Sequence, residues 1–570
     1  MSFRVWAPRA KELSIVVSGK AHKATAEAKG YFKAEPPPEG SEYLLRIDGR
    51  DLPDPRSRFQ PKGIHGPSQY VAKSFDWNDE NFRAPPLSAA VIYELHVGTF
   101  TPEGTLTAAA ERLPHLVELG VTHVELLPLA TFPGRWGWGY DGVALFAPHP
   151  TYGTPADVKR FVASCHAHGL AVLIDVVYNH LGPDGNYLGE YGHYFTKRYN
   201  TPWGAAVNLD DAHSDEVRSF FIDNALMWIE EYHFDGLRLD AVHALYDESA
   251  LHVLQELSAA VHALEPKLGR PIVVIAESDQ NNPRLVRPPE VGGYGLDAQW
   301  SDDFHHALHA ALTGETNGYY SDFGLVEHIA RALTDGFVYA GEYSPFRERR
   351  HGQPLGDVSG HKLLGYLQNH DQIGNRARGE RIGHLCSEGL ARIGAALVFV
   401  SPFVPMLFQG EEWGASAPFQ YFTDHQNPEL ADAVRKGRRE EFRQFGWDPE
   451  QIPDPQDEAT FKRSQLDWAE KDRAPHRERL AFYRGLAQLR RESPELLDGR
   501  RDLVDVSFDE GKRWLRVQRG RVTLLANLGG DSVDLPAPAG ELQLSFPEAA
   551  PKQSGANITL EGESVYIFRA

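Results

Sequence analysis

Four short segments constrain the fold most, because each ends an apolar run on a polar or charged residue. They read D-V-V-Y-N-H at 175–180, G-L-R-L-D-A-V-H at 236–243, I-A-E at 275–277 and L-Q-N-H-D at 367–371. A (β/α)8 barrel builds its site in this way, from buried strands that each end in a functional residue and are separated by helices. The pattern therefore predicts a TIM barrel whose site lies at the carboxyl ends of the strands.

Strand-like runs alternate with amphipathic stretches through the central part of the chain. Near-continuous Val, Ile and Leu runs are typical of buried parallel strands. Stretches with helical periodicity, such as 154–168 and 216–232, predict the connecting helices. The predicted strands match the number that a barrel requires. They are expected at 91–98, 121–128, 170–177, 236–240, 271–277, 295–300, 362–371 and 404–410.

The two ends of the chain differ from this central region. Residues 1–86 contain short alternating runs broken by Pro and Gly, which predict an all-β module, and residues 498–570 show a similar pattern. We therefore expect an α/β protein, with an N-terminal β-sandwich over 1–86, a (β/α)8 barrel over 87–497 and a C-terminal β-sandwich over 498–570. Polar residues 424–480, rich in charge, Pro and Asp, are expected to form an excursion of loops and helices on the barrel rim.

The composition limits the possible partners and compartment. The chain has 570 residues and a net charge of −21, a balance that repels nucleic acid and anionic lipid. An acidic surface that only keeps the protein in solution explains the charge equally well. The two cysteines cannot form a disulfide framework, and no signal peptide or membrane-spanning run is visible. We expect a cytoplasmic monomer that binds neither nucleic acid nor membrane.

Three of the strand-end residues are carboxylates, namely Asp240, Glu277 and Asp371. Paired carboxylates carry out glycoside hydrolysis. Arg238 stands two residues before Asp240 and would keep it anionic, as a nucleophile requires. Glu277 follows an apolar run without a basic neighbour, which would raise its pKa and suit a general acid. Taken singly, a structural Arg–Asp pair and an ordinary strand-end glutamate remain alternatives.

Other polar and aromatic residues accompany these carboxylates. The segment R-W-G-W-G-Y-D at 135–141 places Tyr140 on the loop after the second strand, and flat aromatic faces stack on sugar rings. His180 could donate to a sugar hydroxyl, and Asp371 could bind sugar hydroxyls and stabilise positive charge on the ring. Asp175 lies within a strand and is interpreted as a buried structural carboxylate.

These segments resemble the four conserved regions of the α-amylase superfamily, glycoside hydrolase family 13. The matching residues are D-V-V-Y-N-H at 175–180, G-L-R-L-D-A-V-H at 236–243, Glu277 and N-H-D at 369–371. The resemblance implies that Asp240 is the nucleophile, Glu277 the acid/base and Asp371 the transition-state stabiliser of a configuration-retaining enzyme. It also assigns four residues to the sugar ring at the cleaved bond: Tyr140, His180, Arg238 and His370.

Further segments resemble a narrower subgroup of this superfamily. They lie at 179–188, 201–204, 276–284, 299–306 and 368–376. Members of that subgroup act on maltooligosyltrehalose and related α-glucans, and cut the α-1,4 bond to a terminal trehalose. The resemblance implies substrate contacts by Asp141, Trp203, His243, Asp303, His305, Phe346, Arg347, Gln372 and Asn375. The long calcium-binding domain of secreted amylases has no counterpart here, so we expect no required metal and no cofactor.

Three alternatives stay open at this stage. A glucan branching enzyme would use the same carboxylates and transfer the glycosyl group to a sugar 6-hydroxyl. The S-D-D-F-H-H segment at 301–306 argues against it. A general α-amylase or debranching hydrolase would differ in its products. A non-catalytic carbohydrate-binding protein on the same barrel is disfavoured because all three carboxylates are present. The sequence does not decide whether the N-terminal module binds glucan.

Overall fold

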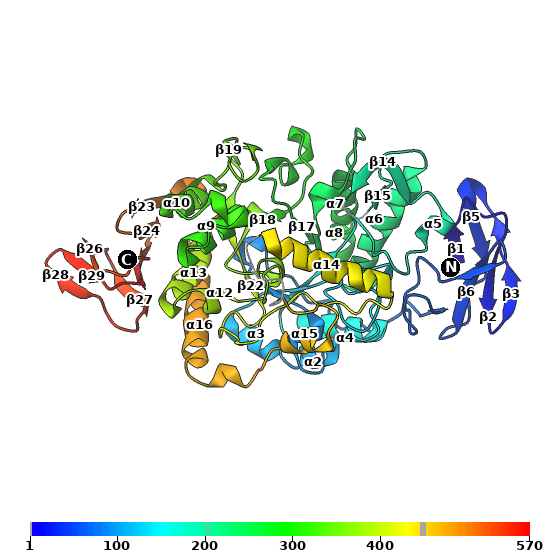
Figure 1. Cartoon of the computed structure of the whole chain (residues 1–570), viewed down its shortest axis with the longest axis horizontal. Helices are drawn as coiled ribbons and strands as arrows, with labels where there is room; N and C mark the ends of the chain where they lie inside the picture. Colours follow the sequence, from blue (N-terminus) through cyan, green and yellow to red (C-terminus); the bar gives the residue numbers. More distant parts are fainter. Residues whose placement is uncertain (1–2, 202–203, 445–451) are drawn as a thin grey trace.

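Three structural regions follow one another along the chain and lie in a row, with the two termini at opposite ends (Figure 1). The computed structural model describes residues 3–201, 204–444 and 452–570. A β module forms the N-terminal end, a barrel surrounded by helices the middle, and a second β module the C-terminal end.

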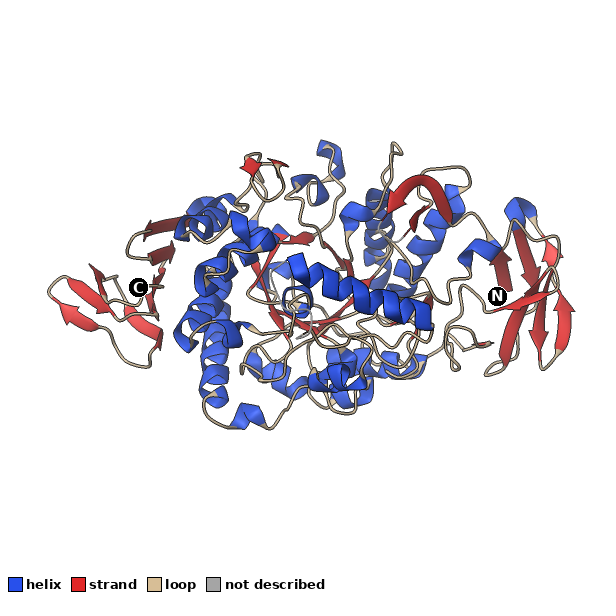
Figure 2. Ribbon diagram, in the orientation of Figure 1, coloured by secondary structure: helices blue, strands red, loops and turns tan. Residues whose placement is uncertain are grey.

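The central region is a closed barrel of parallel strands. Each strand pairs with the next one around the ring, and the last, β22, pairs with the first, β9. Figure 2 shows this ring of strands enclosed by helices. The predicted TIM barrel is thus confirmed, with a strand inside each of the predicted ranges. The barrel strands are β9 (Ile92–Leu95), β10 (His123–Leu126), β13 (Ala171–Val176), β16 (Gly236–Leu239), β17 (Val273–Ala276), β18 (Ala298–Trp300), β21 (Leu363–Tyr366) and β22 (Val404–Phe408).

The strands form where the sequence supplies unbroken apolar runs. Every residue of β13 and of β22 is buried, as expected for strands that are covered by helices outside and by side chains inside. One predicted strand, 362–371, is too long. β21 ends at Tyr366, and the short helix α11 (His370–Gly374) follows it. The apolar run misleads because Leu367 is buried without being part of the strand.

Helices return the chain from one strand to the next. α4 shows how local sequence fixes their limits. The Thr154 hydroxyl accepts a hydrogen bond from the Asp157 backbone amide, and the Asp157 carboxylate accepts one from the Thr154 backbone amide. The helix therefore begins with a capping box. The larger helices around the barrel are α3 (Leu113–Leu119), α4 (Pro155–Ala167), α6 (Ser214–Glu230), α7 (Val253–His262), α9 (Asp302–Thr313), α10 (Val326–Asp335), α13 (Glu388–Val400) and α16 (His476–Glu492).

The N-terminal module consists of two antiparallel sheets. One has the strand order β1-β5-β4 and the other β3-β2-β6-β7, with β8 paired to β6. Ion pairs attach the module to helix α6 and the residue that follows it, including Arg56 to Asp223 at 2.7 Å. The strands are β1 (Phe3–Trp6), β2 (Leu13–Val17), β3 (Lys20–Lys23), β4 (Thr25–Ala26), β5 (Tyr31–Ala34), β6 (Glu42–Ile47), β7 (Arg50–Leu52) and β8 (Ser68–Gln69).

The C-terminal module also has two antiparallel sheets, β23-β24-β25-β30-β27 and β26-β29-β28, with an apolar cluster of their residues. The Arg519 guanidinium joins it to the barrel by donating to the carbonyls of Val400 and Ser401. The domain boundaries at 86/87 and 497/498 stay a prediction. The strands are β23 (Val504–Asp509), β24 (Trp514–Arg519), β25 (Val522–Asn527), β26 (Val533–Pro536), β27 (Glu541–Phe546), β28 (Lys552–Ser554), β29 (Asn557–Leu560) and β30 (Ser564–Arg569).

In its described residues, the polar segment before α16 includes the α-helices α14 (Pro428–Gln444) and α15 (Glu458–Arg463). α14 crosses the middle of the view in Figure 1. Arg438 on this helix donates to the Gly374 carbonyl at 2.9 Å and to the Asn375 side chain at 3.1 Å. The excursion therefore contacts the end of α11. Among the helices of the described ranges, none is long and apolar enough to cross a membrane.

The barrel wall makes a specific prediction at Gly236, the first residue of β16. A Cβ there would lie 2.3 Å from the Val273 carbonyl oxygen on β17. We expect Gly236→Ala to lower the free energy of unfolding by about 1–3 kcal/mol, because strands on both sides prevent relaxation. The measurement is the thermal melting temperature. Gly189→Ala is the matched control, since no atom lies within 4 Å of its Cβ. Equal melting temperatures for both variants would contradict the prediction.

Candidate active site

The three predicted carboxylates follow three strands of the barrel at its carboxyl-terminal rim. Asp240 comes directly after β16 and Glu277 directly after β17, and these strands are neighbours. Asp371 lies in the first turn of α11, after β21. Because parallel strands present their carboxyl ends on the same side, all three side chains belong to one face of the barrel.

Arg238 stands below this rim and joins two of the carboxylates. Its Nη1 lies 2.9 Å from Asp240 Oδ1, and its Nη2 lies 3.7 Å from Glu277 Oε2. The side chain is fully buried, and its guanidinium lies 4.3 Å from the Trp300 ring centroid, a cation–π distance. Asp240 and Glu277 therefore share one buried cation.

The Asp240 carboxylate is fixed through both of its oxygens. Oδ1 accepts from Arg238, and Oδ2 accepts from Asn179 Nδ2 at 2.8 Å. The side chain stays 12% exposed, so one side of the carboxylate is still accessible. Two fixed donors leave little rotational freedom, and this is the preorganisation that nucleophilic attack requires.

Glu277 has a different environment. Its Oε2 accepts the backbone amide of Ala241 at 2.6 Å. Burial raises the pKa of Glu277 to about 8, and the carboxylates of Asp240 and Asp371 act in the same direction, against the Arg238 guanidinium. A carboxyl group with this pKa still holds its proton at neutral pH, as a general acid must.

Tyr140 and His370 connect Asp371 to the same cluster. The Tyr140 hydroxyl donates to Asp175 Oδ2 at 2.6 Å, and His370 Nε2 lies 2.8 Å from that hydroxyl. His370 Nε2 also lies 3.4 Å from Asp371 Oδ2. Burial disfavours a charged imidazole, yet the carboxylates of Asp371 and Glu94 together raise the pKa of His370 to about 9. The residues expected at the sugar ring thus form one hydrogen-bonded group.

His180 and Asp141 lie beside this group. His180 Nε2 lies 3.0 Å from the Tyr140 carbonyl oxygen, and burial lowers the pKa of the imidazole. Asp141 Oδ2 lies 3.7 Å from His425 Nε2, and burial raises the pKa of this carboxyl. Asp141 lies in the connection after β10, and His180 lies in the loop after β13.

Other predicted substrate-binding residues lie around Asp279, which follows β17. Arg347 donates to Asp279 Oδ2 at 3.1 Å, and Phe346 beside it is 45% exposed. His243 is exposed, and its charge lowers the pKa of Asp279, so it belongs to the same neighbourhood.

Gln372 and Asn375 border Asp371 on the short helix α11 and its end. The Gln372 side-chain oxygen accepts from Tyr320 at 3.3 Å, and Asn375 Nδ2 lies 3.4 Å from Asp371 Oδ1. Trp203 lies outside the described residues.

Two predicted sugar contacts require correction. Asp303 is buried, and its Oδ2 accepts from Asn281 Nδ2 and from the amides of Val338 and Tyr339, each at 2.8 Å. His305 is also buried, and its ring stacks on Tyr366. Neither side chain is free to contact a substrate, because both point into the protein. They position loops and strands near the site.

Three further residues near the site are absent from the sequence-based predictions of substrate contacts. Asp302 precedes Asp303 at the start of α9, Glu94 holds His370, and Asp279 holds Arg347. Only Asp302 had a usable signal, because it stands in the S-D-D motif directly after a strand. Glu94 lies in mid-strand, where an apolar run hides it.

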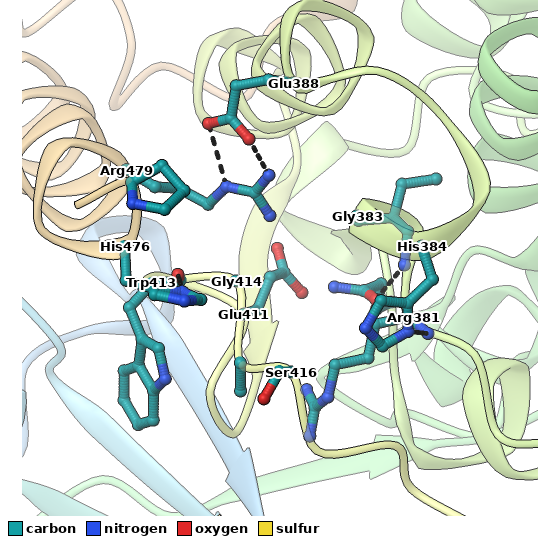
Figure 3. Close-up of a pocket in the computed structure, with 14 residues that line it drawn as sticks. Arg381, Gly383, His384, Glu388, Glu411, Trp413, Gly414, Ser416, His476 and Arg479 are labelled. Carbon is teal, nitrogen blue, oxygen red and sulfur yellow. Dashed lines mark hydrogen bonds and ion pairs between the residues drawn. The ribbon is translucent and has the colours of Figure 1, made fainter. Parts of the chain in front are cut away.

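A separate cavity of about 250 Å³ lies among α12 (Ile382–Leu385), α13, α16 and the loop after β22. Figure 3 shows Glu388 and Arg479 facing each other at its edge, paired at 3.1 Å. Glu411 and Trp413 also line it, and none of the three predicted catalytic carboxylates does. Across the ranges that the structure describes, no group of three or more His, Cys, Asp or Glu side chains could hold a metal ion.

Comparisons with known proteins agree with this architecture. The family described as Alpha amylase, catalytic domain matches residues 69–203, and a domain of unknown function, DUF3459, matches residues 500–567. A solved structure described as a putative alpha amylase from Salmonella typhimurium superimposes with a TM-score of 0.91 at 38% identity, and covers 100% of this chain and 97% of that one. The barrel and its rim are thus those of an α-amylase-type glycoside hydrolase.

Full-length relatives narrow this class. The malto-oligosyltrehalose trehalohydrolase of Arthrobacter ramosus is 48% identical over 100% of this chain and 99% of the relative. The protein of the same name from Rhizobium sp. (strain M-11) is 47% identical over 100% and 97%. A 1,4-alpha-glucan branching enzyme of Bacillus caldolyticus is 35% identical over only 52% of this chain. The chain belongs to the malto-oligosyltrehalose trehalohydrolase family.

The correction at Asp303 leads to a test of stability. We expect Asp303→Asn to lower the free energy of unfolding by about 1–3 kcal/mol. An amide oxygen is a weaker hydrogen-bond acceptor than a carboxylate oxygen, and the new amide nitrogen would be a donor placed among other donors. Thermal melting measures this loss. The control is Asp357→Asn, because Asp357 is exposed. Asp322→Asn would not serve as a control, because Asp322 is also buried. An unchanged melting temperature for Asp303→Asn would contradict the buried role.

Proposed function

We propose that this chain hydrolyses the α-1,4 bond between a maltooligosaccharide and a terminal trehalose, releases free trehalose and retains the anomeric configuration. The observation that carries the proposal is the full-length similarity to trehalohydrolases, at 48% identity in one case. The shared contact of Asp240 and Glu277 with Arg238 supports it at the level of chemistry.

The proposed mechanism has two steps. Protonated Glu277 gives its proton to the glycosidic oxygen while Asp240 attacks the anomeric carbon, so the bond to trehalose breaks and a covalent glycosyl ester forms. Glu277, now ionised, takes a proton from water as the water attacks the same carbon. The ester bond breaks, the maltooligosaccharide leaves, and both carboxyl groups return to their initial states.

The remaining residues bind and stabilise the ring at the cleaved bond. Asp371 is proposed to stabilise positive charge that develops there in the transition state. Arg238 holds the Asp240 carboxylate in place, and Tyr140, His180 and His370 offer hydrogen bonds to hydroxyl groups. Specificity then depends on polar groups that pair with hydroxyls of the correct sugar and stay unpaired with the wrong one.

A glucan branching enzyme and a general amylase-type hydrolase are the alternatives. The branching-enzyme relative is 35% identical over 52% of this chain, whereas the trehalohydrolase relative is 48% identical over the full length. We further propose a cytoplasmic monomer that uses no metal or cofactor. The two free cysteines, Cys165 and Cys386, support a reducing compartment. Size-exclusion chromatography with light scattering tests the monomer.

The function predicts a defined product pattern. Incubation with maltotriosyltrehalose should yield trehalose and maltotriose, and incubation with amylose should yield no new 1,6 branches. We expect Asp240→Asn to lower turnover by roughly 10⁴-fold or more, because the nucleophile is lost. The variant should stay folded because Arg238 keeps its bond to Asp175. Product chromatography and the melting temperature measure both. Turnover at the wild-type rate would remove Asp240 from the mechanism.

The raised pKa of Glu277 predicts the alkaline limit of activity. As pH rises through about 8, the acid loses its proton and cannot protonate the leaving oxygen. We therefore expect kcat/KM to fall along a limb centred near pH 8. The measurement is kcat/KM from pH 5 to 10, with the melting temperature followed as a control for unfolding. A limb centred near pH 5 would show that Glu277 is not the acid.

A further inference from the structure

Two adjacent carboxylates at the start of α9 face in different directions. Asp303 is buried and accepts three hydrogen bonds from its own chain. Asp302 is half-buried and receives one, from the Tyr366 hydroxyl at the end of β21. An ionised carboxylate has two oxygens and about four acceptor positions. Most of the acceptor capacity of Asp302 is therefore unused within the described residues.

Asp302 also differs from the other carboxylates of the rim in having no cation. Asp240 pairs with Arg238, Asp279 pairs with Arg347, and Asp371 lies 3.4 Å from His370. Among the described residues, no Arg, Lys or His nitrogen lies within 4.0 Å of an Asp302 oxygen. Keeping a carboxylate partly out of water without a counter-charge costs folding free energy. A role in ligand binding explains why the carboxylate is kept in this position despite the cost in folding free energy.

The order of strands in the barrel places Asp302 within the catalytic rim. β18, which Asp302 follows, pairs with β17 on one side and with β21 on the other. Asp302 thus stands between Glu277 and Asp371. Burial raises the pKa of Asp302 to about 7, and the charge of Asp371 acts in the same direction, while the Asp302 charge raises the pKa of Glu277. These mutual effects show that the three carboxylates lie close enough to one another for their charges to interact.

The same order indicates which sugar Asp302 meets. Three of the residues proposed to hold the ring attacked by Asp240, namely Tyr140, His180 and Arg238, come from the β10, β13 and β16 sector, while His370 and Asp371 reach it from α11 after β21. Glu277 follows β17 and protonates the departing oxygen. Asp302 follows the strand next to that of Glu277, on the side away from Asp240, and on this ground we assign it to the leaving sugar.

We propose that Asp302 binds the leaving sugar, with its free carboxylate oxygen accepting a hydroxyl of the trehalose unit, and so determines specificity for trehalose-terminated glucans. The proposal rests on the proposed function. Trehalose joins two glucose rings through both anomeric carbons, so its second ring presents hydroxyls that a reducing-end maltose unit places elsewhere. An unpaired acceptor in the site would then penalise the plain glucan.

Another explanation is purely structural. An acidic side chain in the first turn of a helix stabilises the helix through its dipole, and Asp302 is the first residue of α9. That role predicts a loss of stability on substitution without a change in substrate preference. The two explanations therefore differ in a measurable quantity.

The test compares two substrates of equal length, maltotriosyltrehalose and maltopentaose, which both contain five glucose units. The quantity is the ratio of their kcat/KM values. We expect Asp302→Ala to lower this ratio at least about tenfold, the contribution of one hydrogen bond to a charged group. Asp302→Asn should lower it less, since an amide keeps one acceptor. Trehalose, used as a competitive inhibitor, should bind these variants about tenfold more weakly.

Asp303→Asn is the matched control, because it alters the neighbouring inward-facing carboxylate. It should lower the melting temperature and leave the substrate ratio within about twofold of wild type. If Asp302→Ala does not fold, Tyr366→Phe gives the same comparison by removing the hydroxyl that orients Asp302, and the ratio should still fall. A ratio within twofold of wild type in the folded Asp302 variants, or in Tyr366→Phe if they do not fold, would overturn the proposal.

The outcomes separate this inference from the proposed function. If the wild-type chain releases no trehalose from maltotriosyltrehalose, the proposed function fails. If it does release trehalose and the folded variants keep both their ratio and their trehalose affinity, only the role of Asp302 fails.

Discussion

The guanidinium of Arg238 lies inside the barrel without contact with water and joins Asp175, Asp240 and Glu277. A buried cation of this kind is stable only with partners, and removing one partner from such a group typically costs 3–5 kcal/mol. The interaction is therefore a requirement of the fold as well as of the chemistry. It lets the rim hold several carboxylates close together, and it gives Asp240 and Glu277 different surroundings although they stand on neighbouring strands.

That difference in surroundings separates the two roles. Asp240 is held by Arg238 and Asn179. Burial raises the pKa of Glu277 to about 8, and nearby negative charges act in the same direction, against the Arg238 guanidinium, which is farther from Glu277 than from Asp240. The two modules at the ends of the chain attach to other parts of the barrel, through helix α6 on one side and through Val400 and Ser401 at the end of α13 on the other. The rim is built from the barrel and its own loops.

Sequence alone predicts the barrel and its main carboxylates because the signal is local. An apolar run that ends at Asp240 or Glu277 is visible without coordinates, and so is the Arg238 that precedes one of them. The choice between Asp302 and Asp303 is not local. It depends on Tyr366 from another strand and on Asn281 from another loop, which bind one carboxylate each. Periodicity likewise cannot show that β21 stops at Tyr366 while the buried run continues.

The contact between α14 and α11 has a consequence for how this barrel can vary. Arg438 on the excursion donates to Gly374 and Asn375, the end of the helix that carries Asp371. The position of α11 thus depends partly on a helix outside the barrel wall, in a polar segment of the sequence. A change in the excursion would therefore be transmitted through Arg438 to the helix that carries Asp371.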